Sequence, residues 1–215
     1  MIMKKILYYG DSITDAGRNA DRGSLISIGQ GYPVITASRL ALDHPGELEF
    51  DNRGISGNRV VDLYSRIKVD CWNTNPDVLS ILIGINDVWH DVNEHNGVEA
   101  DRFENIYNIM ISETKERFPD IKIIIMEPFI LHGWATDEKW DQFRSEADLR
   151  AAAAKRVAEK NGAIFLPLQA DFEKALEIQP AGYWIGDGVH PTIAGHQLIA
   201  DKWLKLFEEK IYPTL

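Results

Sequence analysis

Residues 10–14, Gly-Asp-Ser-Ile-Thr, follow directly on the apolar run Ile-Leu-Tyr-Tyr at residues 6–9. The apolar run predicts a buried strand, so Ser12 falls where this strand gives way to a turn. In open α/β sheets the carboxyl ends of the strands face the crevice where ligands bind. Ser12 is therefore a candidate nucleophile, and the backbone N–H groups after it can hold a developing negative charge. Taken alone, Gly-Asp-Ser also fits an ordinary turn or a helix N-cap.

Outward from this junction, short apolar runs alternate with segments of helical periodicity. Further strands are expected at residues 48–50, 77–84, 121–126 and 163–168, and helices at residues 32–42, 60–72 and 99–118, in a segment ending at 161, from 171 and from 192. The run at 77–84 is apolar almost without interruption, which is typical of a strand buried on both faces. The alternation predicts an α/β fold in three layers, a doubly wound sheet of about five parallel strands between helices.

The chain shows no internal division. No stretch rich in proline, glycine or serine interrupts the 215 residues, so residues 1–215 are expected to form one domain. Polar stretches at 13–31 and 88–97 are expected to be loops, as is the segment that holds Tyr183 and Trp184.

Two more strand ends deliver polar residues and glycines. Residues 52–58 read Asn-Arg-Gly-Ile-Ser-Gly-Asn, where glycines just past a strand indicate a sharp bend or a close backbone approach. Residues 84–87, Gly-Ile-Asn-Asp, follow the next predicted strand. A plain strand-to-helix turn would explain each segment separately. In a parallel sheet, however, both lie along the same rim as Ser12.

A further motif, Asp-Gly-Val-His-Pro at residues 187–191, stands just before the last predicted helix. Its spacing lets Asp187 accept a hydrogen bond from Nδ1 of His190 while Nε2 faces outward. This is the orienting half of a serine triad, in which the histidine takes the proton of the serine and the acid fixes the histidine tautomer. Pro191 favours extended backbone at His190 and so lifts its side chain out of the helix. The alternative is a common Asp-Gly turn beside a solvated histidine.

Together, the four motifs resemble in order and spacing those of the SGNH (GDSL-type) hydrolases, along nearly the whole chain. The resemblance implies a flavodoxin-like fold and a serine esterase mechanism that needs no metal and no organic cofactor. It implies that Ser12 is the nucleophile, His190 the general base and Asp187 its partner. It also implies an oxyanion hole with three donors, the N–H of Ser12, the N–H of Gly54 and the side chain of Asn86.

The composition limits the partners. A net charge of -10 and a pI near 5.1 argue against nucleic acid and anionic membrane surfaces, since both would repel the protein. A single cysteine excludes an internal disulfide, and no His/Cys spacing for zinc is present. The apolar stretch after the basic N-terminus is too short for a signal peptide, and no run reaches the length of a membrane span. A small-molecule ester substrate and a cytoplasmic location are therefore expected.

The choice of ester depends on finer details. Trp89 and Trp184 lie close to the motifs and are expected to border the mouth of the site, where an indole can stack on a sugar ring, although each could simply be packed. The amino-acid sequence of residues 52–58, 84–89 and 189–196 resembles that of the family branch that includes bacterial intracellular xylan acetylesterases. This resemblance implies deacetylation of acetylated carbohydrates such as xylo-oligosaccharides, and homo-oligomerisation. The alternatives are a broad-specificity lysophospholipase or thioesterase acting on longer acyl chains, and a carbohydrate-binding or scaffold protein that has lost catalysis.

The remaining polar residues near the motifs are expected to be structural. Asp11 and Asp15 flank the serine and are interpreted as capping or turn residues. Asp87 is expected to fix its loop. His196 is expected to be a structural residue of the last helix, and Cys71 a core residue.

Overall fold

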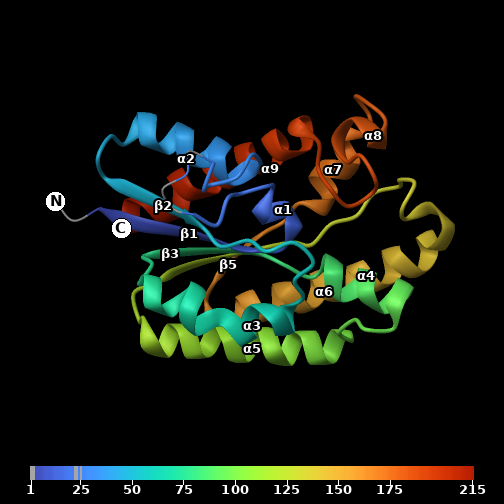
Figure 1. Ribbon diagram of the computed structural model, residues 1–215, viewed down its shortest axis with the longest axis horizontal. Helices are drawn as coiled ribbons and strands as arrows, with labels where there is room; N and C mark the ends of the chain where they lie inside the picture. Colours follow the sequence, from blue (N-terminus) through green and yellow to red (C-terminus); the bar gives the residue numbers. More distant parts are fainter. Residues whose placement is uncertain (1–2, 22–23, 25) are drawn as a thin grey trace.

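The computed structural model describes residues 3–21, 24 and 26–215 (Figure 1). Within these residues, one sheet of five parallel strands has the order β2-β1-β3-β4-β5. The strands are β1 (Lys4–Gly10), β2 (Leu48–Asn52), β3 (Val78–Leu82), β4 (Lys122–Met126) and β5 (Ile164–Leu166). This is the flavodoxin-like order, so the predicted doubly wound parallel sheet is confirmed. The order reverses between β1 and β3, and such a switch point is where ligands bind in these sheets.

The register of the strands brings the three motif-bearing ends together. Tyr8 of β1 lies opposite Asn52 of β2, and Gly10 lies opposite Leu82 of β3. The segments that follow β1, β2 and β3 therefore emerge side by side at one edge of the sheet.

Two separate apolar cores cover the two faces of the sheet. Figure 1 shows α2 (Tyr32–Asp43) and α9 (Ile193–Leu206) on one face, and on the other α3 (Val60–Asp70), α5 (Ala100–Arg117) and α6 (Trp140–Asn161). Neighbouring residues of β1 point to opposite faces, as the pleat requires. The Tyr8 ring lies 5.6 Å from Trp203 of α9, whereas the Tyr9 hydroxyl donates to the Leu63 carbonyl of α3.

Three predicted loops are wrong in part, because each contains helical residues. Residues 85–94 form α4 (Ile85–Glu94), whose narrow apolar stripe of Ile85, Val88 and Val92 is buried among polar neighbours. The segment with Trp184 forms the single turn α8 (Ala181–Trp184). Short apolar stripes of this kind are easily missed in a polar stretch.

The other short elements are α1 (Ser12–Asp15), α7 (Gln169–Ala175), three 3₁₀ turns η1 (Trp72–Thr74), η2 (Asp137–Lys139) and η4 (Tyr212–Thr214), and the π turn η3 (Phe207–Ile211). The third of the partly wrong loops is the predicted loop at 13–31, whose first three residues belong to α1, because Asp11 caps a helical turn there. After α1 its described part holds no helix or strand, and its positions 22, 23 and 25 lie outside the described residues.

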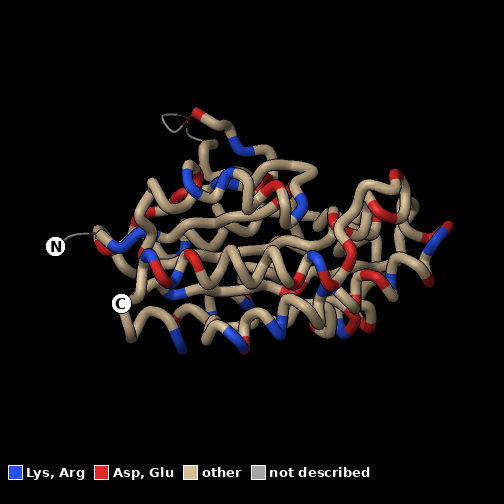
Figure 2. Tube along the Cα trace, turned by 90° about the horizontal axis from the view of Figure 1, so that it is seen from below, with Lys and Arg blue, Asp and Glu red and all other residues tan. Residues whose placement is uncertain are grey.

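Charged residues are spread along the fold. Lys and Arg alternate with Asp and Glu along the trace in Figure 2. In the part of the chain that the structure describes, no helix is long and apolar enough to cross a membrane.

Candidate active site

Ser12 is held at the start of a one-turn helix directly after β1. Asp11 caps this helix, since its Oδ1 accepts the N–H of Ile13 at 3.0 Å. The helix ends at Ala16, which adopts a left-handed conformation with φ of 43°. The sharp strand-to-helix turn places Ser12 at the edge of the sheet.

Ser12, His190 and Asp187 form a continuous hydrogen-bonded chain across 178 residues of sequence. The Oγ of Ser12 lies 2.9 Å from Nε2 of His190, and Nδ1 of His190 lies 2.7 Å from Oδ2 of Asp187. The other oxygen of Asp187 accepts the N–H groups of Val189 at 2.8 Å and His190 at 2.7 Å. Gly188, with φ of 103°, allows this tight turn. The structure thus brings together the three residues that the motifs single out.

The hydrogen bonds set the charges in this chain. Burial alone would raise the pKa of Asp187, but the hydrogen bonds from the His190 side chain and from two backbone N–H groups lower it to about 2. The hydrogen bond to Asp187 raises the pKa of His190 above its usual value, against the opposing effect of burial. The pair is therefore arranged to stabilise a protonated imidazole beside an ionised carboxylate.

The three other aspartates near the strand ends have structural contacts, as predicted. Asp11 caps α1, Asp15 accepts the N–H of Arg18 and both the N–H and hydroxyl of Ser56, and Asp87 accepts the N–H of Val60. Complete burial raises the pKa of Asp11 to about 7 and that of Asp87 to about 8. Both carboxyl groups are thereby much less acidic than Asp187.

His196 and Cys71 are also structural, as predicted. Nδ1 of His196 accepts the N–H of Tyr32 at 3.2 Å, and its ring stacks on the Tyr32 ring. Burial lowers the pKa of His196 to about 4, which keeps the ring neutral and able to accept this bond. Cys71 is fully buried in the core between α3 and the sheet.

Asn86 lies in the first turn of α4, directly beyond β3. Its Nδ2 donates to the backbone carbonyl of Asn58 at 3.1 Å, which ties α4 to the loop after β2. An amide nitrogen carries two protons, so a second donor remains at Nδ2.

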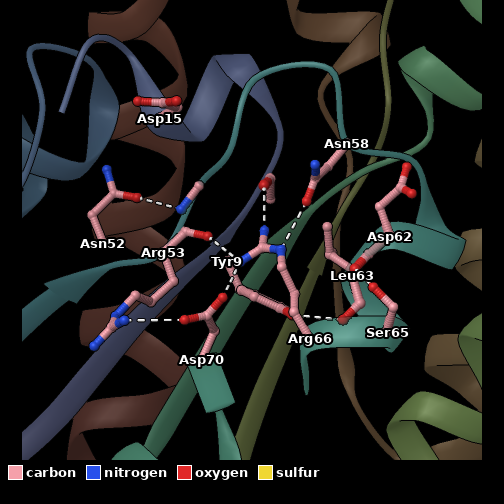
Figure 3. Close-up of polar contacts among 12 residues, drawn as sticks. Tyr9, Asp15, Asn52, Arg53, Asn58, Asp62, Leu63, Ser65, Arg66 and Asp70 are labelled. Atoms are coloured by element: carbon pink, nitrogen blue, oxygen red, sulfur yellow. Dashed lines mark hydrogen bonds and ion pairs between the residues drawn. The ribbon is translucent and has the colours of Figure 1, made fainter. Parts of the chain in front are cut away.

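The two glycines of the loop 53–58 differ in their contacts. The N–H of Gly54 donates to Oδ1 of Asn52 at 2.8 Å (Figure 3), so it is satisfied inside the protein rather than offered to a substrate. A Cβ at Gly54 would lie 2.3 Å from the backbone nitrogen of Asp15, so this glycine permits close packing against α1. Gly57 has φ of 82°, and its N–H makes no hydrogen bond to another described residue. Gly57 directly precedes Asn58, whose backbone carbonyl accepts the hydrogen bond from Asn86.

Among the described residues, no group of three or more His, Cys, Asp or Glu is arranged to hold a metal ion.

The sequence matches a known family. The family model described as GDSL-like Lipase/Acylhydrolase matches residues 8–198, which span the chain from β1 into α9. The chain belongs to the GDSL-like lipase/acylhydrolase family. It is a carboxylic ester hydrolase.

Relatives of this GDSL-like hydrolase include an acetylxylan esterase of Geobacillus stearothermophilus, 35% identical over 210 residues that cover 94% of this chain and 93% of the relative. The crystal structure of that organism's Axe2, an acetylxylan esterase, matches with a TM-score of 0.83 at 34% identity, covering 94% of this chain and 93% of that one. A GDSL-like protein of Parabacteroides merdae matches with a TM-score of 0.89 at 38% identity, covering 98% of this chain and 99% of that one.

Trp89, Trp184 and Trp134 are buried to different depths. Trp89 lies in α4 and packs against Phe143 at 5.5 Å between rings, and Trp184 donates from Nε1 to the Gln179 carbonyl at 3.1 Å. Both indoles are half-buried. Trp134, which sequence reasoning did not select, is 80% exposed.

The loop that carries Trp134 is bonded to the segment that carries Asp187. Leu131 donates its N–H to the Gly188 carbonyl at 3.0 Å, and Ala135 donates to the Asp187 carbonyl at 3.2 Å. A Cβ at Gly133 would lie 2.2 Å from the carbonyl carbon of Asp187, so only glycine allows this approach. The contact holds Trp134 beside the acid of the hydrogen-bonded chain.

Proposed function

We propose that the protein is a serine esterase that removes acetyl groups from carbohydrates, with acetylated xylo-oligosaccharides as its substrate class. The observation that carries the proposal is the hydrogen-bonded chain from Ser12 through His190 to Asp187 at the carboxyl edge of the sheet. The acetyl and sugar specificity is supported by the 35% identity to the acetylxylan esterase of Geobacillus stearothermophilus.

In the first half of the reaction, Oγ of Ser12 attacks the acetyl carbonyl carbon while its proton passes to Nε2 of His190. The carbonyl double bond opens and leaves a negative charge on the acetyl oxygen. When the intermediate collapses, the bond to the sugar oxygen breaks, and the sugar takes the proton from His190. The product that remains is an acetyl ester on Ser12.

In the second half, water gives a proton to His190, and the oxygen of this water attacks the carbonyl carbon of the acetyl ester. The bond to Ser12 breaks, Ser12 regains its proton from His190, and acetic acid leaves and ionises to acetate by giving its proton to water. Asp187 stays ionised throughout, because its hydrogen bonds hold its pKa at about 2, and it stabilises the imidazolium in both steps.

The negative oxygen needs donors that are in place before the reaction. In this proposal the N–H of Ser12 and Nδ2 of Asn86 supply two of them. The third is the N–H of Gly57 in place of the expected Gly54, because the Gly54 N–H already donates to Asn52.

The leaving sugar is proposed to lie against the aromatic side chains beside the triad. Trp134 is the most exposed of these, and an open indole face suits the apolar face of a pyranose ring. Trp89 shares the face of α4 that carries Asn86, three residues away, and Trp184 lies three residues before Asp187. These half-buried indoles would shape the mouth of the site.

The proposal is tested by hydrolysis of p-nitrophenyl esters from acetate to decanoate, beside acetate release from acetylated xylo-oligosaccharides. For an acetyl-specific site, we expect the rate of p-nitrophenyl ester hydrolysis to fall steeply beyond two to four acyl carbons, because such a site has no room for a longer chain. Ser12→Ala serves as the inactive control. A maximum at medium or long chains would instead favour the lysophospholipase or thioesterase alternative, and no serine-dependent hydrolysis of any ester would contradict the proposed mechanism.

A further inference from the structure

Arg66 of α3 contacts the ends of two different strands with one guanidinium group (Figure 3). Its Nη2 donates to the carbonyl of Gly10, the last residue of β1, at 3.3 Å. Its Nη1 donates to the carbonyl of Arg53, directly after β2, at 2.8 Å, and its Nε donates to Oδ1 of Asn58 at 2.8 Å. Arg66 therefore holds both ends of the loop 53–58 and the residue two positions before Ser12.

The Arg66 guanidinium is itself firmly fixed. Its side chain is only 14% exposed, Nη1 also pairs with Oδ2 of Asp70 at 2.8 Å, and the group stacks over the Tyr9 ring at 4.5 Å. A cation that is largely removed from water is stable only where its donors find acceptors, and four of the five N–H donors of Arg66 do so in these hydrogen bonds. The planar fork of arginine reaches these acceptors in different directions at once, which the single nitrogen of lysine cannot do.

The contacts of Arg66 continue to the donors of the site. Asn58, whose side chain Arg66 holds, accepts Nδ2 of Asn86 on its backbone carbonyl at 3.1 Å. Gly57 directly precedes Asn58 in the same loop. The donors assigned to Ser12, Gly57 and Asn86 come from three separate strand ends, and Arg66 contacts or reaches each of these ends through at most one residue.

We infer that Arg66 is a positioning residue that fixes the oxyanion donors relative to one another. The inference rests on the proposed function, since it assigns a purpose to the donors of that mechanism. The Arg66 guanidinium is directed at protein acceptors, so its effect should appear in kcat and leave substrate binding largely unchanged.

The test compares Arg66→Lys with Arg53→Lys on p-nitrophenyl acetate. Arg53 is a matched control, because its side chain pairs with the same Asp70 and with Asp51 and, among the described residues, donates to no strand-end carbonyl. Arg66 contacts only the backbone carbonyl of Arg53, which the substitution keeps. We expect Arg66→Lys to lower kcat by about 10- to 100-fold with KM within about threefold, since misplacing reacting groups by 1 Å can cost about 10²-fold. We expect Arg53→Lys to stay within about threefold of wild type, as for most partly exposed ion pairs.

A double-mutant cycle with Asn86→Ala separates positioning from general damage. If Arg66 acts through the donors, its effect on kcat should be much smaller in the Asn86→Ala background than in wild type. Equal effects in both backgrounds, or a kcat for Arg66→Lys that matches Arg53→Lys, would overturn the inference while leaving the esterase mechanism intact. If wild type shows no ester hydrolysis beyond that of Ser12→Ala, the proposed function itself is refuted.

Asn58→Ala provides a second variant should Arg66→Lys fold poorly. It removes one acceptor of Arg66 and keeps the guanidinium with its other partners. A fall in kcat of about 3- to 10-fold at unchanged KM is expected, in line with a smaller displacement of the loop. An unchanged kcat in a folded Asn58→Ala protein would count against the inference.

Discussion

The two sides of the site are built in opposite ways. One side, here called the donor side, consists of residues 10–15, 53–58 and 84–86, and its segments are bonded to one another and to the Arg66 guanidinium. The other, here called the aromatic side, consists of residues 130–136 and 179–190, and it exposes Trp134 and Tyr183 by 80% and 52%. A preorganised set of donors needs the first kind of construction, whereas selection of a leaving group needs surface that meets the substrate.

The bond between Ser12 and His190 joins the two sides, so its removal should have the largest effect. Ser12→Ala deletes the atom that forms the acyl-enzyme, and we expect kcat for p-nitrophenyl acetate to fall by about 10⁵-fold. Initial rates at high enzyme concentration measure this loss. Ser65→Ala, at an exposed position of α3, is the control and should keep wild-type rates.

The Ser12→Ala result decides whether Ser12 is the nucleophile. If a folded Ser12→Ala protein keeps more than a few per cent of wild-type turnover, Ser12 does not form the acyl-enzyme. The same melting temperature in both variants and wild type would show that the loss is not a loss of fold.

The aromatic side also carries the group that sets the pH dependence. His190 must be neutral to accept the serine proton, so activity should rise with pH through the pKa of His190, which Asp187 raises. Asp187→Asn removes this carboxylate, so the pKa of His190 should fall and the acid limb of the kcat/KM profile should move to lower pH. The plateau should fall by about 10⁴-fold, because the tautomer is no longer fixed.

A pH profile of wild type and Asp187→Asn from acid to neutral pH measures both changes. An acid limb that stays in place or moves to higher pH would mean that Asp187 does not control the charge of His190. Asp137→Asn is a matched control. Asp137, the exposed first residue of η2, bonds Nδ1 of His132 in the same manner as Asp187 bonds His190.

Sequence and structure agree most closely on Ser12 and Asn86 of the donor side and on Asp187 and His190 of the aromatic side. Ser12 and Asn86 each follow a buried strand within a few residues, and parallel strands end at a common edge, so local sequence and simple topology suffice to place them. His190 and Asp187 are three residues apart, so their hydrogen bond is also a local property. These residues could therefore be predicted before any long-range contact was known.

The remaining features depend on contacts that local sequence does not encode. Gly54 and Gly57 follow the same strand, and only the reach of the Asn52 side chain to one of them shows which N–H is already satisfied. Trp134 lies beside Asp187 through loop-to-loop hydrogen bonds between positions about fifty residues apart. Helix α4 is hard to predict from the sequence, because its buried apolar stripe is narrow and most of its other residues are polar.

Weakening the donor side alone should have an intermediate effect. Asn86→Ala removes one donor to the developing oxyanion, and we expect kcat to fall by about 10²–10³-fold with little change in KM. Steady-state kinetics on p-nitrophenyl acetate measure the two constants separately. Asn93→Ala, an exposed change on the same helix, should leave both unchanged, and a rise in KM at unchanged kcat in Asn86→Ala would place this side chain in substrate binding instead.

The smallest effect is expected on the aromatic side, and it should depend on the substrate. Trp134→Ala removes an exposed indole without disturbing the backbone bonds of its loop, so the chemistry at Ser12 should be unchanged. Loss of one stacking contact should raise KM for acetylated xylo-oligosaccharides by about 3- to 10-fold, on the scale of other aromatic contacts. The KM for p-nitrophenyl acetate, which has no sugar, should stay near wild type. Leu42→Ala, an equally exposed apolar change on α2, controls for lost surface area. Equal changes with both esters would mean that Trp134 supports the loop of Asp187, and the division between a donor side and a substrate-selecting side would then fail at this residue.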